Sequence, residues 1–131
     1  MSDDLSALDF SSPEVSDDEP AVPVFIVANP PGTVTVTTFM DGRVKDIELS
    51  SRATELTEYE LADEIVVIAG LATQEAKSAQ YAFMLEGMRD QGHDDAATRD
   101  FLARDLDLPT PEEARTARAQ LFATRYSSDH V

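Results

Sequence analysis

Short runs of β-forming residues follow the first 22 positions. The run 24–28 is wholly apolar and ends at Asn29-Pro30-Pro31-Gly32, a cluster that strand pairing cannot cross. The segment 33–40 alternates valine and threonine with the period of two that is typical of a strand buried on one face. Asp41-Gly42 then predicts a tight type I′ turn, after which 43–49 returns antiparallel. The apolar positions of 43–49 change phase by one residue, so we also expect a bulge there.

A long helix follows the three predicted strands. Thr57 and Glu60 have the spacing of a capping box, which marks its start. Apolar residues then recur at helical spacing, with one isolated glycine before Gly87. The pattern predicts a single helix of roughly thirty residues. The positions that carry the spacing are Leu61, Ile65, Ile68, Ala72, Ala76, Ala79 and Phe83.

Two shorter helices complete the predicted fold. Leucines and a phenylalanine among charged residues predict a short helix over 96–108. Thr110-Pro111-Glu112-Glu113 combines an N-cap threonine, a proline at the first helical position and a capping-box glutamate, and predicts a helix to about Thr124. The polar end, 127–131, is expected to fray. We therefore expect one α+β domain over 23–126, with a three-stranded antiparallel sheet followed by one long helix and C-terminal helices.

The predicted helix is much longer than the predicted sheet. Strands of about six residues at ~3.3 Å each extend for roughly 20 Å, whereas thirty helical residues at ~1.5 Å extend for about 45 Å. The distal part of the helix, 72–83, therefore needs cover from the C-terminal helices, from a second copy of the chain or from a different protein. The sheet also has two edges with unpaired backbone groups. A homodimer is the simplest arrangement that satisfies both needs.

The candidate contact residues are apolar positions of the long helix and of the last helix. Core membership is the alternative for each of them, because apolar residues at helical spacing usually belong to the core. The candidates are Leu71, Tyr81, Phe83, Leu85, Leu121 and Phe122.

Charge and composition narrow the classes of function. The chain has 26 acidic and 10 basic side chains and a net charge of −16, which repels phosphate backbones and anionic lipid. It has no cysteine for a disulfide, a thiol nucleophile or a thiolate metal site. No apolar run approaches the ~18 residues of a membrane span, and the N-terminus carries acids where a signal peptide needs a basic start. We expect a cytoplasmic protein whose partners are neither nucleic acid nor membrane.

The first 22 residues differ from the rest of the sequence. They hold seven acids and no base, a composition that predicts a disordered acidic tail. Within it, Leu5, Leu8 and Phe10 form a small apolar cluster. This cluster is either a docking motif that folds on a partner or a set of chance apolar residues in a solubilising tail.

Residues that could support catalysis or metal binding are few. His93 lies beside Asp94, and His130 is one residue from the end, so the two histidines lack the helical spacing of a zinc site. No serine has the context of a nucleophile elbow, and Gly32 and Gly42 belong to predicted turns rather than to a phosphate-binding loop. We expect no enzyme activity, no cofactor and no metal.

Tyr59 and Asp63 form a Tyr-x-x-x-Asp pattern, which resembles the export signal of type VII secretion substrates. Such a signal normally follows a helical hairpin that contains Trp-x-Gly, and this chain has no tryptophan. In the alternative interpretation, the tyrosine packs and the aspartate favours the positive end of the helix.

Two family resemblances suggest a function. The order of three strands, a long helix and a further helix resembles the YbaB/EbfC family of small dimeric nucleoid-associated proteins. A closer resemblance, to the EspH and EspD proteins of mycobacterial type VII (ESX) secretion, rests on several segments of the sequence; the tail segment 5–10 is more similar to EspH. These segments are 25–31, 33–36, 40–43, 61–65, 79–85, 108–114 and 122–126.

The Esp resemblance implies a non-enzymatic accessory protein of type VII secretion. We expect a cytosolic chaperone or scaffold that binds secretion substrates of the EspE and EspF type. One alternative is a YbaB-like DNA-binding protein, for which Arg43, Lys45 and Arg52 form the local basic group outside the C-terminal helices. Phosphate binding needs several uncompensated cations on one face, which argues against it. The other alternative is an exported, EspD-like secretion-associated protein.

Overall fold

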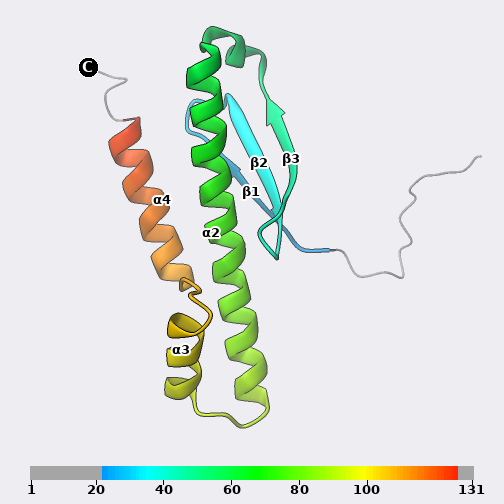
Figure 1. Cartoon of the computed structure of the whole chain (residues 1–131), viewed down its shortest axis with the longest axis vertical. Coiled ribbons are helices and arrows are strands. Elements are labelled where there is room, and N and C mark those ends of the chain that lie inside the picture. The colour runs from blue at the N-terminus through cyan, green and yellow to red at the C-terminus, as the bar shows by residue number, and fades with distance from the viewer. Residues whose placement is uncertain (1–21, 127–131) are drawn as a thin grey trace, which may run out of the picture.

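Three antiparallel strands, a short 3-10 helix and three α-helices make up residues 22–126, the part of the chain that the computed structural model describes. The α+β fold expected from the sequence is confirmed. The predicted tail motif of Leu5, Leu8 and Phe10 lies outside the described residues, as does 127–131. The elements in chain order are β1 (Val24–Ala28), β2 (Val34–Phe39), β3 (Val44–Leu49), η2 (Ser51–Glu55), α2 (Glu58–Asp90), α3 (Asp95–Arg104) and α4 (Pro111–Arg125) (Figure 1).

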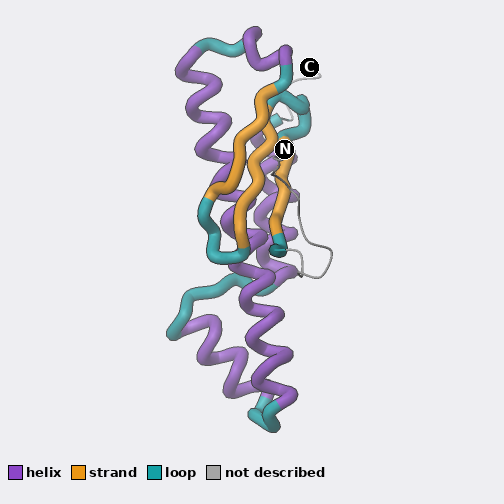
Figure 2. The backbone as a smooth tube through the Cα atoms, turned by 90° about the vertical axis from the view of Figure 1, so that its right-hand side faces the viewer, coloured by secondary structure: helices purple, strands orange, loops and turns teal. Residues whose placement is uncertain are grey.

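The main core lies between one face of the sheet and α2. The strand order is β1-β2-β3, and β2 pairs antiparallel with both neighbours. Val27, Val34 and Val36 are buried on the inner face and pack with Ile68 and Leu71 of α2. The alternation predicted for β2 is confirmed, because its valines are buried and the intervening side chains are only half buried. Figure 2 shows the outer face of the sheet, which no helix of residues 22–126 covers.

The turn between β2 and β3 differs from the predicted type I′ turn. A type I′ turn needs positive φ at both central residues, but Gly42 alone has it in this turn, at 92°. The Gly42 N–H donates to the Phe39 carbonyl at 2.9 Å, and the Phe39 N–H donates to the Arg43 carbonyl at 2.9 Å. This pattern is that of a type I turn followed by a glycine bulge. The Asp41 carboxylate stabilises it by accepting from the Arg43 N–H at 3.0 Å.

β3 is an exposed edge strand with the predicted bulge. Thr37 pairs with Asp46 and Thr38 pairs with Val44, so Lys45 is the additional residue. All six residues of β3 are exposed. The strand therefore extends beyond the part of the sheet that α2 covers.

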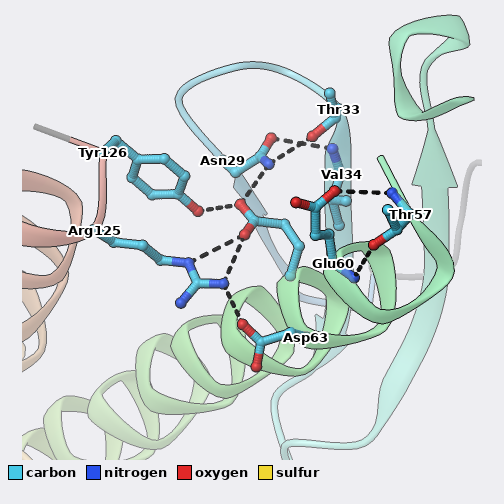
Figure 3. Close-up of polar contacts among 9 residues, drawn as sticks. Asn29, Thr33, Val34, Thr57, Glu60, Asp63, Arg125 and Tyr126 are labelled. Atoms are coloured by element: carbon cyan, nitrogen blue, oxygen red, sulfur yellow. Dashed lines mark hydrogen bonds and ion pairs between the residues drawn. The ribbon is translucent and has the colours of Figure 1, made fainter. Parts of the chain in front are cut away.

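α2 begins at the predicted capping box. The Thr57 hydroxyl accepts from the Glu60 N–H at 3.1 Å, and the Glu60 carboxylate accepts from the Thr57 N–H at 2.9 Å (Figure 3). The helix has 33 residues and continues through Gly87. The helix ends before Gly92. The φ of 90° at Gly92 lets the His93 N–H donate back to the Met88 carbonyl at 3.0 Å.

The C-terminal helices cover one side of the long helix. α2 is about 50 Å long at ~1.5 Å per residue, more than twice the length of the strands. α4 lies beside the first half of α2, and α3 lies beside its distal half (Figure 1). The sequence left open whether the C-terminal helices, a second copy or a different protein would cover α2. The structure shows the C-terminal helices in this position. Around α3, Tyr81, Leu102 and Leu108 form a second core cluster.

Candidate protein-binding site

Most of the predicted contact residues lie within the two core clusters. Leu71 and Tyr81 are buried. Leu121 and Phe122 of α4 pack, partly buried, against the core between α2 and the sheet. Leu85 packs in the same way against the cluster around Tyr81. These five side chains therefore hold the chain's own helices together.

Phe83 differs from the other candidates, because its side chain is 70% exposed. It continues the stripe of Ala72 and Ala76, which faces the sheet along α2. From the sequence, the alternative to a partner contact at Phe83 was a place in the core. The sheet ends before this point, since the Gln80 side chain already reaches the Met40 carbonyl of the β2–β3 turn at 2.5 Å. Phe83 is thus exposed because α2 is longer than the sheet, so that none of the three described strands lies beneath it.

A larger apolar surface lies where β3 extends past α2. Cross-strand pairing places Ile47 opposite Val36 and Leu49 opposite Val34, and paired residues share a face of the sheet. Val44, opposite a buried threonine, has the same orientation. The apolar side chains of β3 thus belong to the inner face, but they remain exposed because the helix lies over β1 and β2.

α2 contributes two residues to this surface. The Thr73 hydroxyl donates to the Gly42 carbonyl at 3.2 Å, which identifies the side of α2 that faces the β2–β3 turn. Val66 and Tyr59 lie about two and about four helical turns earlier on that side. Their side chains are 69% and 91% exposed. We call the resulting surface the open face, which consists of Val44, Ile47, Leu49, Tyr59 and Val66.

On the opposite side of α2, a buried carboxylate joins three parts of the chain (Figure 3). Asn29, in the β1–β2 turn, donates from its amide to Glu64 at 2.7 Å and to Thr33 at 2.7 Å. Arg125, at the end of α4, donates to Glu64 from Nε at 3.1 Å and from Nη2 at 3.0 Å. The Tyr126 hydroxyl donates to the same carboxylate. We call these five residues the Glu64 cluster.

The surroundings fix the protonation states within the Glu64 cluster. Burial raises the pKa of Glu64, but the hydrogen bonds from Tyr126, Asn29 and Arg125 outweigh it and hold this pKa below its ordinary value. Burial, with the hydrogen bond to Glu64, raises the pKa of Tyr126 far above its ordinary value. Near neutral pH the carboxylate is therefore ionised and the phenol protonated, which suits a clamp between elements.

Other candidate chemical groups remain dispersed. Across residues 22–126, the structure contains no group of three or more histidine, aspartate or glutamate side chains placed to hold a metal ion. In the same range, no helix combines the length and the apolar character needed to cross a membrane. Within the basic group considered for DNA, Arg43 pairs with Asp41 at 2.6 Å, and Arg52 donates to the Pro31 carbonyl at 3.2 Å.

Sequence comparison connects this architecture with protein secretion. The chain is 48% identical over 119 residues to the ESX-1 secretion-associated protein EspH of Mycobacterium tuberculosis, a match that covers 88% of this chain and 65% of EspH. It is 49% identical over 118 residues to the ESX-1 secretion-associated protein EspD of the same species, covering 87% of this chain and 64% of EspD. The chain is a homologue of EspH and EspD. It spans slightly less than two thirds of the length of either relative.

Four of the segments that resemble EspH and EspD meet in the Glu64 cluster. Asn29 belongs to the first of these segments, Glu64 to the segment at the start of α2, and Arg125 and Tyr126 to the last one. No protein-family model matches the sequence. No solved structure matches it either.

Two features of this EspH- and EspD-like chain bear on the proposed export pattern. Tyr59 projects into solvent on the open face. Asp63 accepts from Arg125 at 2.5 Å, next to the Glu64 cluster. The two residues are one helical turn apart on the same side of α2, and the aspartate helps to hold α4.

Proposed function

We propose that the chain is an accessory protein of type VII (ESX) secretion, which binds secretion substrates in the cytosol as a chaperone or scaffold. The similarity to EspH and EspD, both named as ESX-1 secretion-associated proteins, supports a role in this pathway. The resemblance implies substrates of the EspE and EspF type. Because the chain spans only part of its relatives, its partners are inferred from its own surface.

The open face is the observation that carries the binding role. Its five apolar side chains come from two elements that are adjacent in space, whereas isolated apolar residues on a surface need no explanation. The three β3 residues continue the inner face of the sheet beyond the helix that covers it. A partner placed there would extend the existing core instead of building a separate one.

The shape of the open face favours an amphipathic segment as the partner. It is bounded by one strand and one helix, an arrangement into which a helix or an extended segment can place alternate apolar side chains. Full burial of an exposed aliphatic side chain contributes about 1.5–3 kcal/mol, and Val66, which is 69% exposed, can gain a larger part of this than Ile47, which is 41% exposed. A substrate segment of this kind would be protected from aggregation while it remains bound.

Affinity purification of the full chain from a mycobacterial strain with an active ESX-1 system tests the proposal. Ile47→Lys and Val66→Lys place charges on the open face without disturbing a buried side chain. We expect mass spectrometry to identify a secreted ESX substrate with the wild-type chain and at least about a tenfold loss with either variant.

Ile26→Lys is the matched control, because Ile26 is exposed on the outer face of the opposite edge strand. It is expected to retain the substrate. Recovery of the chain without any secreted substrate, or equal recovery by all variants, would contradict the proposal. Immunoblotting of culture filtrate, with a lysis control, tests the cytosolic location.

A further inference from the structure

The two edges of the sheet differ in charge. β1 consists of valine, phenylalanine, isoleucine and alanine, and no residue between positions 20 and 40 is charged. β3, by contrast, carries Lys45, Asp46 and Glu48 along its length and is interrupted by a bulge. Charged side chains and bulges are devices that prevent an edge from pairing with another strand. In the described part of the chain, β1 has neither device.

Backbone groups of β1 are available at this edge. The Asn29 N–H donates to the Val34 carbonyl at 3.0 Å, so this residue directs its backbone groups toward β2. In an antiparallel ladder the direction alternates along the strand, and every second residue of β1 points its N–H and C=O away from β2. These residues are Val24, Ile26 and Ala28.

These three residues can form hydrogen bonds with the same residues of a second copy of β1. In an antiparallel pair with Ile26 opposite Ile26 of the second copy, Val24 lies opposite Ala28, and each of these pairs exchanges two backbone hydrogen bonds. The outer-face side chains then meet outer-face side chains, as the pleat requires. Ile26 is 60% exposed on that face, so the pairing brings apolar side chains of both copies together.

β3 cannot pair with itself in this way without repulsion. If Ile47 lies opposite Ile47 of a second copy, Asp46 lies opposite Glu48, and a shift by one pair brings Glu48 opposite Glu48. Like charges directly opposite each other destabilise a strand pair. In a chain with a net charge of −16, the uncharged edge is the favourable place for two copies to meet.

We propose that two copies of the chain associate by antiparallel pairing of their β1 strands about a two-fold axis at Ile26, which forms one continuous six-stranded sheet. Pro23 and Pro30 flank β1 and restrict the pairing to its five residues. Such a short interface falls below the roughly 1,000 Å² typical of stable complexes, so the dimer is weak and depends on concentration. The pairing does not depend on the proposed binding of secretion substrates.

Sedimentation of the full chain over a wide concentration range tests the pairing. We expect a monomer–dimer equilibrium for the wild-type chain. Ile26→Lys and Ile26→Glu each place like charges at the axis and should raise the dissociation constant at least about tenfold, while the exposed position leaves the fold unchanged by circular dichroism. A mixture of the two variants should dimerise again, because lysine then faces glutamate.

Ile47→Lys serves as the control on the other edge and should dimerise like the wild type. A wild-type chain that stays monomeric at every concentration would overturn the proposal. So would a dimer that survives Ile26→Lys, or a monomer whose β1 edge binds a secretion substrate instead. Loss of substrate with Ile47→Lys and loss of the dimer with Ile26→Lys are separate results, so the two proposals can fail independently.

Discussion

The two ends of α2 are held to the C-terminal helices by different interactions. Near its start, Glu64 accepts hydrogen bonds from Arg125 and Tyr126, which are directional and depend on charge. Toward its end, Tyr81 packs with Leu102 and Leu108 in an apolar cluster that depends on filled volume. The first attachment should therefore respond to pH, whereas the second should respond to the size of its side chains.

Among the variants that test these two attachments, Leu102→Ala should cause the largest loss in the free energy of unfolding. Leu102 is fully buried, so its truncation leaves a cavity and should lower the free energy of unfolding by about 3 kcal/mol. Urea denaturation followed by circular dichroism measures the change. Leu106→Ala is the matched control, because Leu106 is exposed and should lose much less. If both variants lost the same free energy of unfolding, the apolar cluster around Leu102 would not hold α3 to the distal half of α2.

Glu64→Gln should have the next largest effect. It removes the charge that Arg125 and Tyr126 contact, and should lower the free energy of unfolding by about 2 kcal/mol at neutral pH. Glu86→Gln on the same helix is the control, since Glu86 forms an exposed ion pair and should change stability little. If the two variants unfolded at the same urea concentration, the Glu64 cluster would not be a clamp.

The smallest effect is a pH dependence that distinguishes the two attachments. Since the folded-state pKa of Glu64 lies below its ordinary value of 4.5, its contribution is present above that pH and is lost as pH falls through the folded-state pKa. The stability difference between the wild type and Glu64→Gln should therefore shrink on acidification below about pH 4.5. The stability difference between the wild type and Leu102→Ala should not change as Glu64 is protonated. Parallel pH profiles for both variants would contradict the assignment.

Features that depend on near neighbours in the sequence could be predicted well. The capping boxes at Thr57 and Thr110 are confirmed, because each needs only a hydroxyl and a glutamate three residues apart. The β2–β3 turn was predicted with the wrong type. The hydrogen bonds of Phe39 close a loop of three residues, 40–42, instead of the predicted two, and the Asp-Gly pair alone does not reveal the loop length.

Features that depend on distant contacts could not be predicted in detail. The sequence indicated that α2 needs cover, but it left open whether the chain itself supplies it. Glu64 was missed, although it lies among the apolar positions Leu61 and Ile68 on the helix and is buried. Such an acid requires a partner, and its partners Arg125 and Asn29 are distant in sequence. The signal available in the sequence was therefore an acidic residue within an apolar helical stripe, which indicates a buried carboxylate that needs a partner.

The sequence distance between Glu64 and Arg125 also has a consequence for synthesis of the protein. A ribosome produces the hairpins and the whole of α2 before it reaches α4, so the nascent chain exists for a time without the α4 side chains Leu121 and Phe122 that pack against the core. Bringing the two partners together requires closure of a long loop, which favours late docking of the last helix. Translation that stops before position 111 should therefore yield a product that retains its strands but exposes apolar surface to proteases.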